Sequence, residues 1–341
     1  MKYDVTIAIP VYNAEKYLQK TLLSALAQDY SSIEFLILDD CGTDNSIAII
    51  KQLQQEHPRG DDIRIVSQPR NMGVGAARNR IIDEAQGEFL FFLDADDLIV
   101  PTTITLLIAA ARKHDAQWVR ASHERVKMIG NQEERLPIIY SEQVFTTNAD
   151  YATYALNDYG HLDTSIWNIL ICLDLIRRYH LRFVETNFWE DMAFTYQLVT
   201  YVERAALLPD ITYYYYCREN TLSNFQERKI VSKEEVLRNV ATVNSVKSSC
   251  LRLLDKPYLS TWLCTVLTTD FYIVSNVIKN RNRIQPAVSD AELRGIMHSP
   301  LSLAQTLRLG DMQLLVFKLL SMLFPFLSVL FLKSLSRLKT S

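Results

Sequence analysis

The sequence has few glycines, no cysteine pattern and no large excess of either charge. Only 9 of its 341 residues are glycine, about 3% against a usual ~7%. Its five cysteines are widely scattered and odd in number, and no two of them form a CxxC motif. This usage argues against a disulfide framework or a zinc module, so we expect a reducing compartment.

The charge balance excludes a protein built to coat nucleic acid. Lys and Arg together number 36, Asp and Glu number 39, and the net charge is -3. Hydrophobic residues make up 48% of the chain and charged residues 22%, which excludes a disordered or low-complexity chain. The length suggests about two domains at roughly 150 residues each, or one domain with a long extension. The N-terminus leads directly into a strand-like segment and does not resemble a signal peptide.

The first hundred residues alternate between short apolar segments and segments with helical periodicity. Continuous apolar strands such as FLFFL at 89–93 are typical of a sheet that is buried on both faces. Strands that alternate with helices of 10–15 residues predict βαβ units and a mostly parallel, Rossmann-like sheet flanked by helices. The predicted strands are 4–10, 33–38, 62–67 and 88–93, and the predicted helices are 14–28, 44–56 and 74–85.

Beyond Pro101 the alternation becomes less regular. We expect a helix at about 101–114, a strand at 117–126 and mixed structure to about 216, with a half-buried strand at Tyr213–Tyr216. The rest reads as helices at 229–254, 258–280 and 312–332. The predicted organisation is therefore an α/β catalytic domain at 1–220 followed by a helical C-terminal region at 221–341.

Acidic residues follow two of the predicted strands. Asp39 and Asp40 come after the second strand, and Asp94, Asp96 and Asp97 come after the fourth. Ligands of an open parallel sheet bind beyond the carboxyl ends of its strands. Like charges gathered there are unfavourable without a cation, and oxygen ligands suit Mg²⁺ or Mn²⁺. The alternative for Asp97 is a helix N-cap before Pro101.

A glycine-containing segment imitates a dinucleotide-binding motif. Gly73 and Gly75 match the start of GxGxxG, but Arg78 stands where the third glycine would be. The segment follows the third strand, whereas a dinucleotide motif belongs at the first βα turn. A nucleotide-dependent enzyme of doubly wound fold therefore stays only as an alternative. Arg78 is a positive group suited to a nucleotide phosphate or base.

Four stretches together resemble the family 2 glycosyltransferases. They are IAIPVYNAEKYL (7–18), LDDCGTDNS (38–46), NMGVGAARN (71–79) with GEFLFFLDADD (87–97), and FWEDMAFTYQL (188–198). The resemblance implies a GT-A fold and a metal-dependent, inverting transfer of a sugar from a nucleotide-sugar, which we expect to be a UDP-sugar. It also implies a glycan or lipid-linked acceptor in surface polysaccharide synthesis. A non-catalytic relative that binds a nucleotide-sugar or glycan is the alternative.

The resemblance also assigns roles to the residues at the strand ends. It implies that Asp96 is the main metal ligand and that Asp94 lies near the ribose and the metal. The nucleotide-binding residues that it implies are Pro10, Tyr12 and Asn13 around the base and ribose, and Asp39 and Asp40 on base and ribose. Two departures from the family pattern are Cys41-Gly42, where Gly-Ser is common, and Ile169, where Lys is usual.

Two further residues gain roles from the resemblance. Asp191, in the pair Glu190-Asp191, corresponds to the general base that takes the proton of the acceptor hydroxyl; the alternative is a favourable acidic first helical turn. Arg218 lies in a segment similar to one that folds over the diphosphate in relatives, so it is predicted to contact phosphate. For Arg218 a surface salt bridge is an equal alternative.

The C-terminal region is apolar and basic. The uncharged run 319–332 has 14 residues, short of the ~20 that cross a bilayer core. Residues 301–341 hold five Lys or Arg and one acid. An apolar helix flanked by basic residues predicts an interfacial anchor over about 312–339, on the cytoplasmic face of the inner membrane. The alternative is a helix that packs on the catalytic domain or in a dimer interface.

Overall fold

The structure, a computed structural model, divides the chain into two compact units. One unit comprises residues 1–151 and 164–224, and the other comprises 152–163 and 225–341. The structure describes residues 2–130, 132–156, 164–186, 189–218, 231–323, 327–328 and 330. The predicted domain boundary between 220 and 221 lies outside the described residues and stays a prediction.

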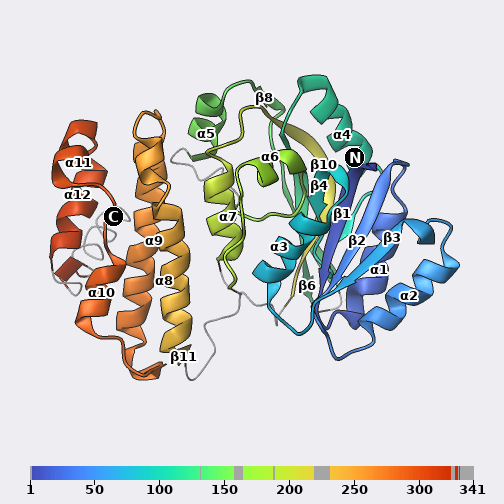
Figure 1. The fold of residues 1–341 in the computed structure, drawn as a ribbon, viewed down its shortest axis with the longest axis horizontal. Coiled ribbons are helices and arrows are strands. Elements are labelled where there is room, and N and C mark those ends of the chain that lie inside the picture. The colour runs from blue at the N-terminus through green and yellow to red at the C-terminus, as the bar shows by residue number, and fades with distance from the viewer. Residues whose placement is uncertain are drawn as a thin grey trace. The chain divides into compact units, whose positions relative to one another are not determined.

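The first unit contains a ten-stranded sheet whose N-terminal half is parallel, as predicted (Figure 1). Its order is β3-β2-β1-β4, and right-handed crossovers require α1 and α2 on one face and α3 on the other. The strands are β1 (Tyr3–Val11), β2 (Ile33–Asp39), β3 (Ile63–Ser67) and β4 (Gly87–Phe92). The connecting helices are α1 (Glu15–Leu26), α2 (Ser46–Glu56) with the short 3₁₀ turn Gly60–Asp62, and α3 (Val74–Glu84).

The second half of this sheet is mixed. Strand β9 pairs antiparallel with both β4 and β6, whereas β6 and β10 pair parallel to each other. The strands are β5 (Leu98–Ile99), β6 (Trp118–Ile129), β7 (Gln132–Ile138), β8 (Gln143–Phe145), β9 (Ile169–Cys172) and β10 (Ala205–Cys217). The helices are α4 (Thr103–His114), α5 (Asn148–Leu156), α6 (Leu173–Arg178) and α7 (Glu190–Leu198). The prediction of an α/β fold with flanking helices is confirmed, and its mostly parallel character holds for β1–β4.

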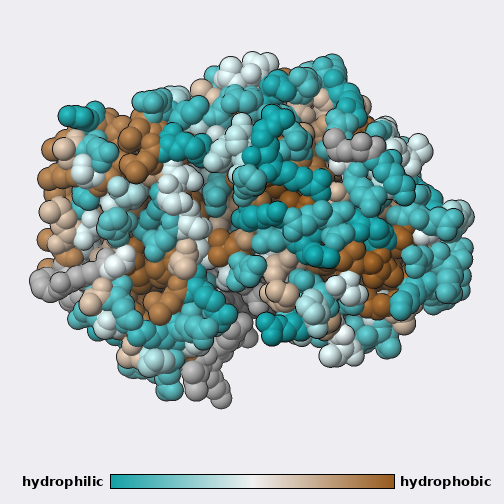
Figure 2. Space-filling model, viewed as in Figure 1, coloured by the Kyte–Doolittle hydropathy of each residue, from teal (hydrophilic) through white to brown (hydrophobic). Residues whose placement is uncertain are grey.

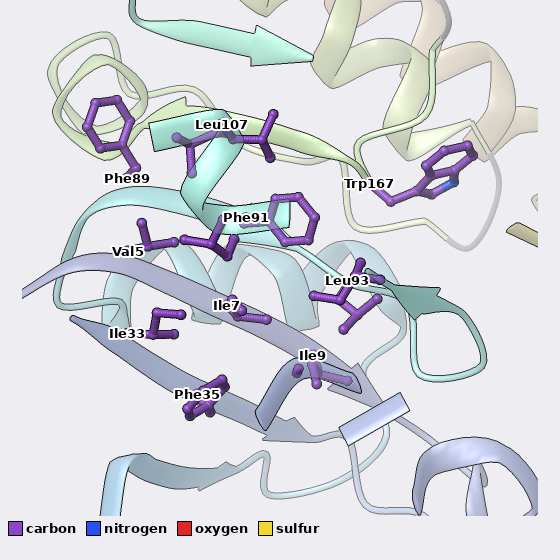
Figure 3. Close-up of a cluster of buried hydrophobic side chains, with 14 of the residues drawn as sticks. Val5, Ile7, Ile9, Ile33, Phe35, Phe89, Phe91, Leu93, Leu107 and Trp167 are labelled. Carbon is purple, nitrogen blue, oxygen red and sulfur yellow. The ribbon is translucent and has the colours of Figure 1, made fainter. Parts of the chain in front are cut away.

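Buried side chains on the central strands form the core of this unit (Figure 3). Ile7, Ile9, Phe35, Phe91 and Leu93 have no exposed surface. Burying each such side chain contributes about 1.5–3 kcal/mol. Helix α1 covers one face of β1 and α3 the other, so its residues are buried on both faces, which explains the continuous apolar sequence. The strands are thereby held in register, and their carboxyl ends are fixed at one edge.

Glycines allow α3 to approach the segment that leads to α7. Gly73 has φ 87°, a left-handed value at the N-cap of α3. A Cβ at Gly75 would lie 2.3 Å from the carbonyl oxygen of Val184. The helix therefore packs directly on the main chain of this segment. This contact sets the position of the side chains that α3 presents to α7.

The second unit is built mainly from helices. Serine caps begin α10 and α11: Ser289 and Ser302 each form a capping box with the residue three positions later. The elements are β11 (Val231–Ser232), α8 (Lys233–Lys247), a 3₁₀ turn (Cys250–Leu253), α9 (Leu259–Lys279), a second 3₁₀ turn (Arg281–Arg283), β12 (Ile284–Gln285), α10 (Asp290–Ile296), α11 (Leu303–Leu309) and α12 (Met312–Met322). The helical prediction for this region is confirmed, although the helix expected at 229–254 begins only after β11.

Helix α9 is long and apolar enough to cross a membrane by length and composition, and 56% of its most apolar window is buried inside the protein. It also carries the fully buried Asp270, whose carboxylate lies 2.5 Å from Nζ of Lys247 on α8. Burying two charges is tolerable when they pair with each other. These features are typical of a core helix. The helix expected at 312–332 is observed as α12, and part of the predicted range lies outside the described residues.

We predict that Gly75→Ala destabilises the α/β unit. The added methyl group would press on the Val184 carbonyl, and such overpacking costs about 1–3 kcal/mol. Gly295→Ala in α10 is the matched control, because no atom lies within 4 Å of its added Cβ. We expect that variant to be unchanged or slightly more stable. Urea unfolding followed by circular dichroism measures both, and equal stability of the two variants would contradict the close approach.

Candidate active site

The carboxyl ends of β1, β2 and β4 meet at one edge of the sheet. Val11 is in register with Asp39, and the amide of Asp40 donates to the carbonyl of Val11 at 2.9 Å. The amide of Leu93 donates to the carbonyl of Ala8 at 3.0 Å. The acidic residues that follow β2 and β4 therefore flank the end of β1, as the strand order predicts.

The turn after β1 is tightly constrained. Asn13 has φ 49°, and its side-chain oxygen accepts a hydrogen bond from the amide of Thr43 at 2.7 Å. A Cβ at Gly42 would lie 3.0 Å from the Asn13 amide nitrogen, so the glycine permits the close approach of these two loops. Tyr12 is half exposed and Pro10 is partly buried. The predicted nucleotide-binding residues of this strand thus lie beside one another at the edge.

The two acids after β2 have different surroundings. Asp40 is buried, and its two carboxylate oxygens accept the amides of Met72 and Gly73 at 2.9 and 3.0 Å. Asp39 is only partly buried, and it accepts the Cys41 amide at 3.0 Å and the Ser67 hydroxyl at 3.2 Å. Asp40 therefore holds the loop before α3 through these two hydrogen bonds, while Asp39 is more exposed to solvent.

Asp97 is bound to β10, and it does not cap a helix. Its carboxylate accepts the Tyr213 hydroxyl and the Tyr216 amide, both at 2.8 Å, and its exposed fraction is 1%. Burial, with the nearby Asp94 and Asp96 carboxylates, raises the pKa of Asp97 well above its ordinary value. Asp97 thus joins the end of β4 to β10 and fixes the loop that carries the two other acids.

Asp96 has an arginine as its counter-ion. Arg218 donates from Nε to the Asp96 carboxylate at 3.0 Å and from Nη2 to the Asp96 carbonyl at 2.6 Å. The Arg218 guanidinium also lies 3.5 Å from the ring centroid of Tyr17. Burial and Asp94 raise the pKa of Asp96, and Arg218 opposes that rise. The predicted alternative of a salt bridge for Arg218 is observed, and its partner is the acid predicted to bind metal.

Arg78 links the end of β4 to the start of α7. Its Nη1 donates to Glu190 at 2.9 Å and also to Asp191, while its Nη2 lies 3.3 Å from Asp94. Glu190 and Asp191 form the acidic first turn of α7, where the helix dipole favours negative charge. Burial raises the pKa of Glu190, an effect that Arg78 opposes. The Arg78 guanidinium therefore contacts both the predicted base, Asp191, and Asp94. Asp94 begins the Asp94-Ala95-Asp96 stretch, which we call the DAD segment.

Three residues of this site had no predicted role. Tyr213 binds Asp97, Tyr17 stacks on Arg218, and Glu190 shares Arg78 with the predicted base. The sequence signal for Tyr213 was the tyrosine run of β10, which reads equally well as an ordinary half-buried strand. Glu190 was visible only as the neighbour of Asp191. Nothing in the sequence distinguishes Tyr17 from other helix tyrosines.

Among the described residues, no three His, Cys, Asp or Glu side chains group as ligands of one ion. Asp97 is engaged by β10, which leaves Asp94 and Asp96 as the carboxylates of the DAD segment that retain exposed surface. Their side chains are 30% and 35% exposed. Mg²⁺ usually takes one or two carboxylates and leaves its other positions to substrate phosphates and water. Two oxygen-bearing side chains at an acidic edge fit that pattern.

The N-terminal part of the chain is similar to known glycosyltransferases. Residues 6–164 match the family model for glycosyl transferase family 2. Over this segment, a little under half of its length, the chain is similar to glycosyl transferase family 2. Over 95 residues the chain is 43% identical to an uncharacterized glycosyltransferase of Haemophilus influenzae. This matched stretch is 28% of this chain and 37% of that protein. The chain is 26% identical over 229 residues to the succinoglycan biosynthesis protein ExoO of Rhizobium meliloti, which covers 64% of this chain and 62% of that protein.

The match to these curated relatives spans less than two thirds of their own length. Among solved structures, S. aureus TarS 1–349 in complex with UDP superposes with a TM-score of 0.64 at 20% identity, which covers 86% of this chain and 78% of TarS. A likeness at this identity concerns the fold. It confirms the predicted GT-A fold.

Proposed function

We propose that this protein transfers a sugar from a UDP-sugar to a glycan or lipid-linked acceptor, with inversion, in the synthesis of a surface polysaccharide. The observation that carries this proposal is the meeting of Asp94 and Asp191 on Arg78, beside the strand ends that hold Asp39 and Asp96. The family supports sugar transfer. The likeness to TarS with UDP supports the nucleotide, and the likeness to ExoO supports the polysaccharide.

The nucleotide is proposed to bind at the ends of β1 and β2. Tyr12 offers a half-exposed ring for the base, with Pro10 and Asn13 beside it. Asp39 is partly accessible and can accept a ribose or base hydrogen bond. Asp40 already binds two main-chain amides, so its proposed contribution is to hold the loop that borders the pocket.

A divalent cation, Mg²⁺ or Mn²⁺, is proposed to bind at Asp96 with Asp94. The carboxylates suit such a cation because they are oxygen ligands that keep exposed surface at an edge where acids gather. When bound, the ion would neutralise charge that develops on the departing diphosphate. In the structure Arg218 occupies one Asp96 oxygen. Arg218 therefore has to exchange partners, and the diphosphate is the partner that we propose.

Asp191 is the proposed catalytic base. Its carboxylate is 25% exposed and lies at the first turn of α7. In the proposed reaction the acceptor oxygen bonds to the anomeric carbon while the bond from that carbon to the diphosphate oxygen breaks. The acceptor hydroxyl proton moves to Asp191. The attack comes from the face opposite the leaving group, so the anomeric configuration inverts.

The first test of the function replaces the base. Asp191→Asn retains the shape and hydrogen bonding of the side chain but cannot take the proton. We expect kcat for UDP release to fall about 10²–10⁴-fold with little change in donor affinity, because the loss concerns the transition state. The measurement is release of the matching nucleoside diphosphate from a panel of UDP-, GDP- and dTDP-sugars, with and without candidate glycan acceptors.

Asp174→Asn is the matched control, since Asp174 is an exposed acid on α6 that pairs with Arg178 one turn further along the same helix. That variant should keep full activity. Wild-type protein that binds UDP but releases none from any donor would favour the non-catalytic alternative. An Asp191→Asn variant within tenfold of wild type would assign the base to another group.

The second test concerns the cation. Asp96→Asn removes the proposed main ligand, so we expect Mn²⁺ to bind at least about tenfold more weakly in the presence of UDP. Electron paramagnetic resonance of Mn²⁺ measures this binding without turnover. Asp174→Asn, which removes an exposed acid of α6, is the control, and its Mn²⁺ binding should persist. Unchanged Mn²⁺ binding by Asp96→Asn would contradict the proposed site.

The C-terminal helices are proposed to contact the cytoplasmic face of the membrane. Figure 2 shows apolar surface in brown over these helices at the left of the view. Lys318, which interrupts the apolar run, donates to the Leu301 carbonyl at 2.7 Å. Phe317 packs on Phe271 of α9, so α12 also has a buried side. The exposed apolar residues here are Leu303, Leu307, Met312, Leu319, Met322, Leu323, Leu327 and Leu330.

The membrane proposal predicts flotation with anionic liposomes. The exposed apolar residues would enter the interface, and the excess of basic over acidic residues in 301–341 would attract anionic headgroups. Truncation after Gly310 also removes the buried Phe317, so the sharper variant is Met312→Gln with Leu319→Gln and Met322→Gln. We expect this triple variant to lose flotation and keep UDP release.

The matched control replaces three exposed apolar residues of the β6–β7 hairpin, Met128, Ile129 and Leu136. This control should still float. If the unaltered protein stays unbound on liposomes of phosphatidylglycerol, the membrane proposal is wrong. A change of oligomeric state in the α12 variant alone would assign the exposed residues to a contact between copies.

A further inference from the structure

Arg78 is a buried cation surrounded by acids from two separate parts of the chain. Its side chain is 4% exposed, and its guanidinium meets Asp94 after β4 and both Glu190 and Asp191 at the start of α7. The two acidic groups are about a hundred positions apart in the sequence. A guanidinium can serve several carboxylates at once because its donors form a flat, rigid fork. The geometry leaves Arg78 little freedom to reach a nucleotide.

The neighbours of Arg78 hold it in this place. Its guanidinium lies 5.5 Å from the ring centroid of Phe183, and that ring stacks on Phe194 of α7 at 4.0 Å. The adjacent Asn79 donates to the Phe183 carbonyl at 2.9 Å and accepts the Phe183 amide at 2.8 Å. Helix α3 therefore contacts the segment before α7 through Asn79, and it contacts the first turn of α7 through Arg78.

The charge of Arg78 is fixed. Burial by itself would lower its pKa, but the Asp191, Asp94 and Glu190 carboxylates raise it above the ordinary value of an arginine. Arg78 thus stays protonated wherever the protein is folded. A permanent positive charge beside a carboxylate favours the charged form of that carboxylate. A general base must be in that form before it can accept a proton.

We propose that Arg78 is a positioning residue that holds the Asp191 carboxylate beside Asp94, and that it is not a contact to the nucleotide phosphate. The inference rests on the proposed function, in which Asp191 is the base. Arg78 takes no proton and forms no bond to the substrate. It acts through Asp191, and it also fixes the distance between the base and the acidic end of β4.

The test is the pH profile of UDP release in Arg78→Gln, with Mn²⁺ and the donor that the wild type uses. Without the guanidinium, Asp191 loses the positive charge that lies between it and the Asp94 and Glu190 carboxylates, and the loss of a neighbouring positive charge disfavours a carboxylate's charged form. We expect the acid limb of kcat/KM to move to higher pH by about one unit or more. We also expect the plateau of kcat to fall about tenfold or more, with KM for the donor within about threefold.

Two further variants separate positioning from simple stability. Arg64→Gln is the matched control, because Arg64 also bridges two glutamates, Glu34 at 2.8 Å and Glu84 at 3.0 Å, away from the acidic edge. It should lose stability without a shift of the acid limb. Arg78→Lys keeps the charge but loses the fork, so it should shift the limb in the same direction by a smaller amount.

The outcomes distinguish this inference from the proposed function. Wild-type protein without UDP release overturns the function. If the wild type is active and the folded Arg78→Gln variant has the same acid limb of kcat/KM as the wild type, the proposed role of Arg78 is wrong. A large rise in donor KM with an unshifted limb would instead make Arg78 a nucleotide contact. If Arg78→Gln does not fold, Arg78→Lys decides, and full kcat with a wild-type limb in that variant overturns the proposal.

Discussion

The site depends on the balance of charge around two arginines. Five acids gather where β4 ends and α7 begins: Asp94, Asp96, Asp97, Glu190 and Asp191. Arg78 and Arg218 are the cations that pair with them in the described part of the chain. Carboxylates this close repel one another unless positive charge lies between them. The edge of the sheet is therefore left with excess negative charge, which suits a site that must accept a metal ion.

The sequence predicted the strands whose ends form this site, because the local pattern of apolar and polar residues determines those strands. Apolar β-branched segments alternating with helices require a parallel sheet, and Asp39 and Asp94 follow strands whose ends must meet. The prediction could not say which charges pair, because the partners of Arg78 lie about a hundred residues apart. That choice depends on how α3 packs against the segment before α7. The same packing, made possible by Gly75, brings Arg78 into contact with acids of both segments.

The second half of the sheet and the C-terminal unit show where local patterns are weaker. Antiparallel strands such as β9 need no helix between neighbours, so the alternation that reveals β1–β4 is absent there. Tyr213 reads as an ordinary strand residue until β10 is placed beside Asp97. In the helical unit the capping serines mark the helix starts well, whereas the buried pair Lys247–Asp270 could not be foreseen from two distant helices.

The central claim is that Arg78 and Asp191 act as one unit. A double-mutant cycle on the free energy of unfolding tests it most directly, with Arg78→Gln, Asp191→Asn and the double variant measured in urea. Because removing Asp191 relieves the repulsion left by the lost arginine, the double variant should be less destabilised than the sum of the singles. We predict a coupling free energy of about 1–3 kcal/mol, and additivity within about 0.5 kcal/mol would contradict the account.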